Sequence, residues 1–92
     1  MRYEHEVVIQ NKLGLHARPA ALFVQIANKY DSSIWVTKGE ETVNGKSIMG
    51  ILMLEANQGS TVLLTAEGDD AGEMIEELSQ LLLDEIDVEE KT

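Results

Sequence analysis

The sequence predicts an α+β fold, in which a four-stranded, mainly antiparallel sheet carries helices on one face. Segments that alternate with period 2 are interleaved with segments of helical periodicity, in the order β-α-β-β-α-β-α. The simplest way for these elements to bury their apolar sides is a two-layer arrangement of sheet against helices. The 92 residues suffice for one hydrophobic core, so we expect residues 1–92 to form a single domain.

The first half of the chain predicts a strand, a helix and a short hairpin. Residues 3–10 alternate imperfectly, as a half-buried strand does, and one face would carry Tyr3, His5, Val7 and Ile9. From residue 17 to about residue 30 the period becomes helical, with an apolar stripe formed by Ala20, Phe23, Val24 and Ala27. Residues 34–37 are β-branched and aromatic, which favours a strand. The turn at 38–41 leads into a short return strand at 42–43.

The second half predicts a short helix, a strand and a longer helix. Residues 47–54 begin with Ser47 and are rich in Met and Leu, which favours a short helix capped by that serine. Residues 61–66 form a strand. A last helix opens at 68–70 and keeps helical spacing through Ala71, Met74, Ile75, Leu78, Leu81 and Leu82. We expect the acidic tail, residues 84–92, to be frayed.

Charge and composition exclude several classes of function. The sequence contains seven Lys and Arg residues and 17 Asp and Glu residues, which gives a net charge of −10. This charge argues against binding to nucleic acid or to an anionic membrane. The chain has no cysteine and no metal-ligand spacing of its two histidines, so we expect no metal site and no cofactor. The first six residues lack the apolar core of a signal peptide, which predicts a cytoplasmic protein.

The segment Gly-Leu-His-Ala-Arg-Pro at 14–19 is the strongest candidate for chemistry. It lies where a loop becomes a helix, which places His16 at or near the N-cap and Pro19 in the first turn. The positive end of the helix dipole disfavours an imidazolium, so His16 would be neutral and nucleophilic, and the same end favours a bound anion. Arg18 would then contact a phosphate. The alternative is an ordinary capping or surface histidine, and His5 is interpreted as a structural side chain on a strand.

The segment at 43–50 is the second candidate. An N-cap serine needs no further function. The apolar residues after Ser47 are too many for one side of a short helix, because Ile48, Met49, Leu52 and Met53 cannot all face inward. An exposed apolar patch of this kind is typical of a docking surface, and methionine makes such a surface adaptable.

Together, Gly-Leu-His-Ala-Arg-Pro-Ala-Ala at 14–21 and Lys-Ser-Ile-Met-Gly at 46–50 resemble HPr, the histidine-containing phosphocarrier family of the bacterial sugar phosphotransferase system. The resemblance extends from the first strand to the last helix. It implies an open-faced β-sandwich, in which three helices cover one face of a four-stranded antiparallel sheet. It also implies a cytoplasmic, monomeric carrier of phosphoryl groups rather than an enzyme.

The resemblance implies roles for particular residues. His16 would be phosphorylated on Nδ1 by phosphoenolpyruvate-charged enzyme I and would pass the phosphoryl group to IIA domains of sugar permeases. Ala17 and Arg18 would offer backbone N–H groups to the phosphate. Ser47 would be phosphorylated by HPr kinase/phosphorylase. The docking patch for enzyme I and IIA domains would consist of Ala21, Ile48, Met49 and Leu52.

Leu13 departs from the family pattern, in which a small polar residue often precedes the loop glycine and orients the histidine. A backbone group or Asn11 remains as a candidate for holding the ring of His16. Leu13 also resembles the nitrogen-related branch of the family, so a regulatory relay or binding module without sugar transport stays the alternative function. A metal-independent hydrolase with His16 as base lacks a visible nucleophile.

Two expectations concern surfaces. Four basic residues (Lys12, Arg18, Lys29 and Lys38) lie between positions 12 and 38 against one acid, and Lys46 precedes Ser47. This distribution predicts a basic-to-neutral rim around His16 that suits a phosphoryl group and an acidic partner. By alternation, Val8, Trp35 and Leu63 lie on the helix-free face, where they form either a second contact surface or ordinary cross-strand packing.

Overall fold

The computed structural model describes residues 1–83, and within them it contains four strands and three helices in the predicted order. The strands are β1 (Arg2–Val8), β2 (Ser33–Lys38), β3 (Glu41–Asn44) and β4 (Thr61–Glu67). The helices are α1 (Ala17–Ala27), α2 (Ile48–Met53) and α3 (Ala71–Leu83). The predicted tail, residues 84–92, lies outside the described residues. No helix within residues 1–83 has the length and apolar content needed to cross a membrane.

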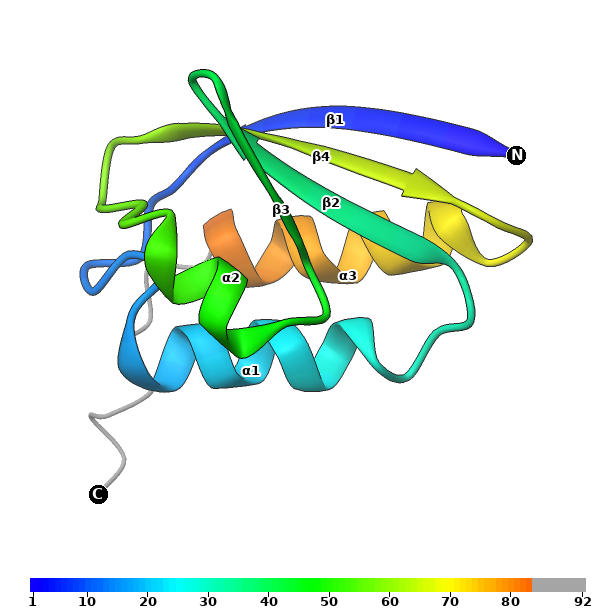
Figure 1. Cartoon of the computed structure of the whole chain (residues 1–92), viewed down its shortest axis with the longest axis horizontal. Helices are drawn as coiled ribbons and strands as arrows, with labels where there is room; N and C mark the ends of the chain where they lie inside the picture. The colour runs from blue at the N-terminus through cyan, green and yellow to red at the C-terminus, as the bar shows by residue number, and fades with distance from the viewer. Residues whose placement is uncertain (84–92) are drawn as a thin grey trace.

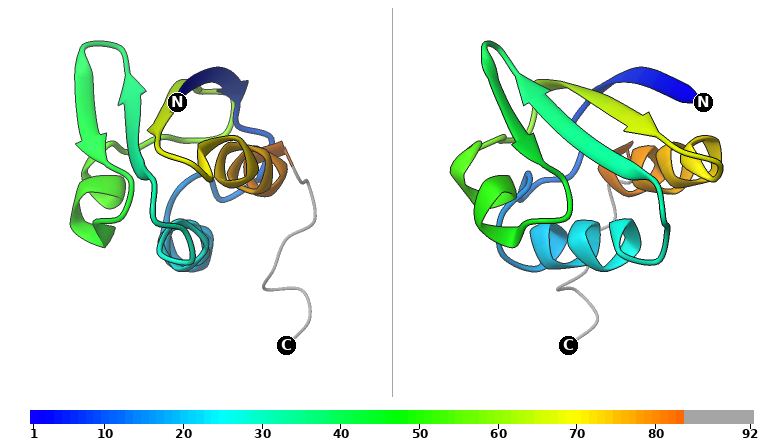
Figure 2. Two further views of the ribbon diagram at one scale, coloured as in Figure 1. Left: turned by 90° about the vertical axis from the view of Figure 1, so that its right-hand side faces the viewer. Right: turned by 45° about the vertical axis from the view of Figure 1, so that its right-hand side comes forward.

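The strands form one antiparallel sheet in the order β1-β4-β2-β3. Its register places Val7 opposite Val62 and Val36 opposite Leu64, so alternate residues of three strands point to one side. All three helices lie on that side and leave the other face of the sheet uncovered (Figures 1 and 2). The predicted fold class, an open-faced β-sandwich, is therefore confirmed.

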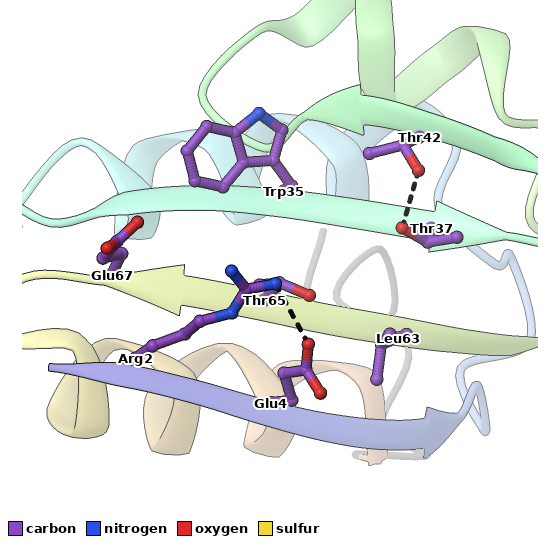
Figure 3. A pocket seen from close by; sticks show the side chains of 8 residues that line it. All are labelled: Arg2, Glu4, Trp35, Thr37, Thr42, Leu63, Thr65 and Glu67. Atoms are coloured by element: carbon purple, nitrogen blue, oxygen red, sulfur yellow. Dashed lines mark hydrogen bonds and ion pairs between the residues drawn. The ribbon is translucent and has the colours of Figure 1, made fainter.

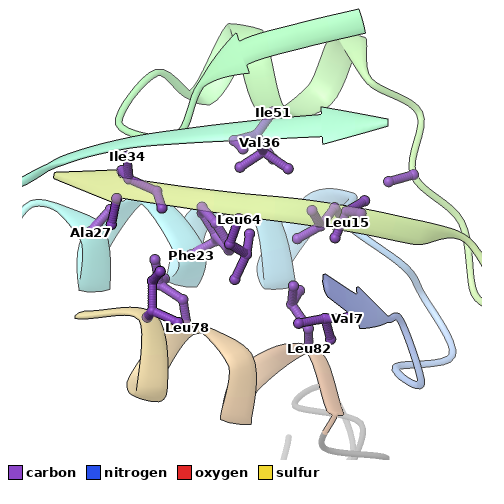
Figure 4. Close-up of a cluster of buried hydrophobic side chains, with 14 of the residues drawn as sticks. Val7, Leu15, Phe23, Ala27, Ile34, Val36, Ile51, Leu64, Leu78 and Leu82 are labelled. Atoms are coloured by element: carbon purple, nitrogen blue, oxygen red, sulfur yellow. The ribbon is translucent and has the colours of Figure 1, made fainter. Parts of the chain in front are cut away.

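The core lies between the sheet and the helices (Figure 4). Phe23 of α1 is fully buried there, as the helical periodicity predicted. Around it pack the inward-facing residues of the strands and helices, among them Val7, Ile34, Val36, Leu64, Ile51, Leu78 and Leu82. Tyr3 and His5 share the face of Val7 but stay exposed, and the Tyr3 ring approaches Gly72 of α3.

The helix-free face carries a shallow hollow (Figure 3). Trp35 and Leu63 lie on this face, as predicted, and line the hollow, but the residue directly opposite Trp35 on β4 is Thr65, and Leu63 lies opposite Thr37. Val8 sits at the end of β1 opposite Thr61 and does not line this hollow. Leu63 is thus a diagonal neighbour of both Val8 and Trp35, whereas Val8 and Trp35 lie on strands that β4 separates.

Asp70 ties the loop after α1 to the start of α3. Its carboxylate accepts hydrogen bonds from the backbone N–H groups of Asp31 and Ser32, each at 3.0 Å, and from the Ser32 hydroxyl. Its carbonyl accepts the Met74 N–H at 3.0 Å, which places Asp70 at the N-cap of α3, the last of the three residues predicted to open this helix. The hydrogen bonds from the Ser32 hydroxyl and the Asp31 backbone lower the pKa of Asp70.

The variant Asp70→Asn is expected to unfold at lower urea concentration than the wild type at pH 7, because an amide offers one acceptor oxygen where the carboxylate offers two. A carboxyl group whose pKa is lowered by folding stabilises the protein at pH values above its ordinary value of about 4. That contribution is lost as the pH falls through the lowered pKa, so the difference between wild type and variant should shrink from pH 7 to pH 3. Asp69→Asn, which removes the same charge one residue earlier, is the control. A difference that is independent of pH would contradict the assignment.

Candidate functional site

His16 occupies the N-cap of α1, as predicted, with extended backbone angles of φ −127° and ψ 160°. The residue before it, Leu15, is fully buried and its N–H donates to the Ala56 carbonyl at 2.8 Å. The first helical hydrogen bond runs from the Ala20 N–H to the His16 carbonyl. A buried leucine on one side and a helix on the other therefore fix the backbone of His16, while its side chain stays half-exposed.

The first turn of α1 has the features of an anion-binding end. Ala17 has a φ of 49°, in the left-handed region, which costs a non-glycine residue about 1–2 kcal/mol. Pro19 follows in the first turn, where its missing N–H is tolerated, and its ring is buried. Ala17 and Arg18 are exposed beside His16. The backbone N–H groups of a first turn have no intrahelical partner, so this end of the helix favours an anion next to the imidazole.

The ring of His16 is held by Asn57, a residue in the turn between α2 and β4. His16 makes no side-chain cap, and its Nε2 lies 2.7 Å from Asn57 Oδ1. Because the amide oxygen is an acceptor, Nε2 carries the proton and Nδ1 carries the ring's lone pair. No local signal in the sequence relates Asn57 to His16.

Asn11, the side chain proposed to hold the ring, has another role. It is buried, and its Oδ1 accepts the Leu13 N–H at 3.0 Å, which shapes the loop before His16. The prediction that Asn11 or a backbone group orients His16 is therefore wrong. The polar side chain that Leu13 cannot provide comes instead from Asn57.

Two loops meet at the site. Gly14 has a φ of 65°, and a Cβ added to it would lie 2.5 Å from the Ala56 carbonyl oxygen and 2.8 Å from Asn57 Cα. A real Cβ essentially never lies this close to a non-bonded atom, so only glycine lets the His16 loop approach the Asn57 turn this closely. The Leu15–Ala56 hydrogen bond closes the same contact.

Of the lysines in the predicted basic rim around His16, Lys46 and Lys29 lie toward the other end of α1, whereas Lys38 reaches the segment just before Asn57. Lys38 donates to the Leu54 and Glu55 carbonyls at 3.2 and 3.1 Å, at the end of α2. Lys46 donates to the Tyr30 carbonyl at 2.7 Å, just beyond α1. The Lys38 ammonium thus neutralises the negative end of α2.

The third lysine, Lys29, lies at the far end of α1 from His16. Its Nζ is 2.8 Å from Glu77 Oε2, and the Tyr30 hydroxyl donates to the other oxygen of the same carboxylate. The hydrogen bond to Glu77 raises the pKa of Tyr30 to about 12, and that carboxylate's own pKa is lowered, first by Lys29. This cluster joins the segment after α1 to α3. The cation nearest to His16 along the chain is Arg18.

Ser47 is the N-cap of α2, as predicted. Its Oγ accepts the Gly50 N–H at 3.1 Å, and the side chain is half-buried. Ile51 packs into the core, whereas Met49 and Met53 are 65% and 64% exposed. The predicted docking residues on α2 are all exposed: Ile48, Met49 and Leu52. The fourth predicted docking residue, Ala21 of the neighbouring α1, is half-buried.

The helix α2 contacts α1, and both views place it near the end of α1 that begins at residue 17 (Figures 1 and 2). The helix α2 therefore lies at the same end of the molecule as the loop that carries His16. Within residues 1–83, no group of three or more His, Cys, Asp or Glu side chains could hold a metal ion.

Comparison with known proteins gives consistent matches. The family model for the PTS HPr component phosphorylation site matches residues 3–84. The phosphocarrier protein HPr of Neisseria meningitidis serogroup A is 44% identical over 79 residues, which cover 86% of this chain and 89% of that protein. The crystal structure of HPr from Bacillus anthracis has a TM-score of 0.86 and 46% identity, covering 88% of this chain and 96% of that chain.

Two further relatives carry different names. Phosphocarrier protein NPr of Shewanella violacea is 37% identical over 81 residues, 88% of this chain and 89% of that protein. A crystal structure of Crh from Bacillus subtilis, described as a swapped dimer, has a TM-score of 0.73 and 44% identity over 87% of this chain and 92% of that chain. The family model spans nearly the whole chain and the relatives agree with it along the same span. The chain belongs to the HPr family of phosphocarrier proteins of the phosphotransferase system.

Proposed function

We propose that His16 accepts a phosphoryl group at Nδ1 from phospho-enzyme I and passes it to IIA domains of the sugar phosphotransferase system. The observation that carries the proposal is the hydrogen bond from His16 Nε2–H to Asn57, which leaves the lone pair on Nδ1. The chain acts as a carrier, since the group it receives is the group it gives away.

The transfer needs no acid or base from the chain. Nδ1 attacks phosphorus, and the bond between phosphorus and the donor's leaving atom breaks, with that electron pair returning to the donor. The phosphoryl oxygens then rest at the positive end of α1, where backbone N–H groups of Ala17 and Arg18 donate to them. The Arg18 guanidinium adds charge-assisted hydrogen bonds. The same geometry serves the onward transfer, which is the reverse displacement with a IIA domain as acceptor.

The exposed patch of α2, with Ala21 of α1, is the proposed docking surface for enzyme I and IIA domains. Ile48, Met49 and Leu52 are apolar side chains on a short helix that packs inward through Ile51 alone. Apolar side chains exposed around a reactive group are typical of partner-binding surfaces. The unbranched methionine lets one surface adapt to several partners.

The experiment that tests the function is incubation with purified enzyme I and ³²P-phosphoenolpyruvate. We expect a labelled chain whose phosphate is labile in acid and stable in alkali, as phosphohistidine is. Addition of a IIA domain should remove the label from the chain and place it on that domain. A chain that never takes up label with active enzyme I would overturn the proposal.

A regulatory relay without sugar transport is the second candidate. It is favoured by Leu13 and by the similarity to a protein named NPr. The two candidates differ in their acceptors, so labelled chain should be offered sugar-type and nitrogen-type IIA domains in parallel. Transfer of the label to nitrogen-type domains alone would favour the regulatory relay.

We predict that the chain is a monomer, and light scattering would test this.

We also propose that HPr kinase/phosphorylase phosphorylates Ser47. The hydroxyl lies at the N-terminus of α2 beside the docking patch, so a phosphate there would add about −1.5 to −2 charges to that surface. ATP-dependent labelling by the kinase should vanish in Ser47→Ala. Labelling that persists would show that another residue is the target.

Two substitutions separate the charge at Ser47 from its capping role. Asp and Asn are both good N-caps, so Ser47→Asp and Ser47→Asn should keep α2 and differ only in charge. We expect Ser47→Asp to slow phosphorylation of His16 by enzyme I about three- to tenfold, since a rim charge next to a partner is worth on the order of 1 kcal/mol. Ser47→Asn should react at the wild-type rate, and equal rates for both variants would contradict the electrostatic reason.

A further inference from the structure

We propose that Asn57 is a positioning residue for phosphoryl transfer, which fixes the tautomer of His16 and stabilises the charge that develops on its ring. This inference rests on the proposed function of His16. It assigns a role to a residue in the turn between α2 and β4, 41 positions along the chain from the histidine. Its side-chain oxygen contacts the imidazole, so the proposed role is exerted through that ring.

The backbone of Asn57 is fixed from both sides. Before Asn57, the Ala56 carbonyl accepts the Leu15 N–H at 2.8 Å, and Gly14 lies in close contact with the same two residues. After it, the Asn57 carbonyl accepts the Ser60 N–H at 2.9 Å. The side-chain oxygen therefore meets Nε2 at 2.7 Å from a turn that is itself hydrogen-bonded to the His16 loop.

In the unphosphorylated chain this contact selects one form of the ring. A neutral imidazole has one N–H and one lone pair. If Nε2 carried the lone pair, it would face the lone pairs of the Asn57 oxygen, which is repulsive. The hydrogen bond therefore keeps the proton on Nε2 and the lone pair on Nδ1, the atom proposed to attack phosphorus.

During transfer the same hydrogen bond becomes stronger. As the bond from Nδ1 to phosphorus forms, the ring takes on positive charge, while the proton stays on Nε2. A donor that gains positive charge makes a stronger hydrogen bond to the Asn57 oxygen. An interaction that is stronger in the transition state than in the ground state raises the rate, in both directions of the exchange.

The tautomer can be measured in the free protein, with no partner present. ¹⁵N NMR shifts of the His16 ring at pH 8 should show Nε2–H alone in the wild type and a mixture of both tautomers in Asn57→Ala. Asn57→Asp retains an acceptor oxygen and should restore the Nε2–H form. The matched control is Gln58→Ala, which removes the neighbouring side-chain amide that donates to the Gln10 carbonyl at 3.0 Å. An unchanged tautomer in Asn57→Ala would overturn the proposal.

The rate of phosphorylation by enzyme I is the second measurement. We expect Asn57→Ala to lower it about tenfold, as the loss of one hydrogen bond to a charged group predicts, and Gln58→Ala to leave it unchanged. A change below twofold for Asn57→Ala would overturn the positioning role even if wild-type chain is labelled normally. Failure of the wild type itself to be labelled would refute the proposed function of His16. The NMR measurement of the tautomer does not depend on labelling and would still test the role of Asn57. Equal unfolding midpoints of both variants would exclude a loss of structure as the cause.

Discussion

Replacement of His16 by alanine is expected to abolish uptake of acid-labile phosphate from enzyme I. The imidazole is the nucleophile, and the remaining positive end of α1 can attract a phosphate but cannot form a bond to phosphorus. We expect no label above the level of a mixture without the chain. Label that survives in His16→Ala would place the phosphoryl group on another residue.

The loss can be separated from a loss of structure. The His16 ring is half-exposed and makes one side-chain hydrogen bond, so the substitution should change the free energy of unfolding by only about 1 kcal/mol. His16→Gln is a sharper variant, because its amide can donate to Asn57 yet offers no nucleophilic nitrogen. His5→Ala, which removes the other histidine from β1, should be labelled as fast as the wild type.

Most of the fold was predictable because the spacing of apolar residues along the chain depends only on the local secondary structure. Alternation and helical spacing located the strands and helices, and the placement of His16 and Ser47 at N-caps followed from their neighbours in the chain. The exposure of Met49 and Met53 followed as well, since a short helix has room for few inward side chains. Each of these conclusions needed only residues within one or two helical turns.

The contacts that complete the site were not predictable, because they join segments far apart in the chain. Asn57 meets His16 only because α2 and the sheet bring two loops together, and neither loop has a periodicity that would reveal it. The lysines were misjudged for a related reason. Counting charges along the chain placed Lys29 and Lys46 near His16, but Lys29 pairs with Glu77 of α3 and Lys46 reaches the Tyr30 carbonyl, contacts that depend on the fold.

The second large effect is expected at Gly14. A methyl group there must adopt a positive φ and would also overlap the backbone of Ala56 and Asn57. Gly39 has nearly the same φ, 62° against 65°, but a Cβ added to it meets nothing within 4 Å. The pair Gly14→Ala and Gly39→Ala therefore separates backbone strain from overlap within one protein.

Gly39→Ala should lower the free energy of unfolding by about 1–2 kcal/mol, the cost of the left-handed conformation for an L-residue. Gly14→Ala should cost about 1–3 kcal/mol more, as overpacking does, because the atoms it meets are backbone and cannot rotate away. Urea denaturation of the two variants measures both numbers. Equal losses would show that the two loops are not in the tight contact described for Gly14.

The variants Gly14→Ala and Gly39→Ala also test whether the contact of the Gly14 loop with Ala56 and Asn57 affects both the stability of the fold and phosphoryl transfer. Pushing the Gly14 loop away from Ala56 would strain the Leu15–Ala56 hydrogen bond and move His16 off Asn57. Gly14→Ala should therefore slow phosphorylation of His16 under conditions where the variant is still folded, and the ring should lose its fixed tautomer. Gly39→Ala lies in the turn between β2 and β3 and should slow neither. A Gly14 variant that is destabilised yet transfers phosphoryl groups at the wild-type rate would mean that the loop contact serves the fold alone.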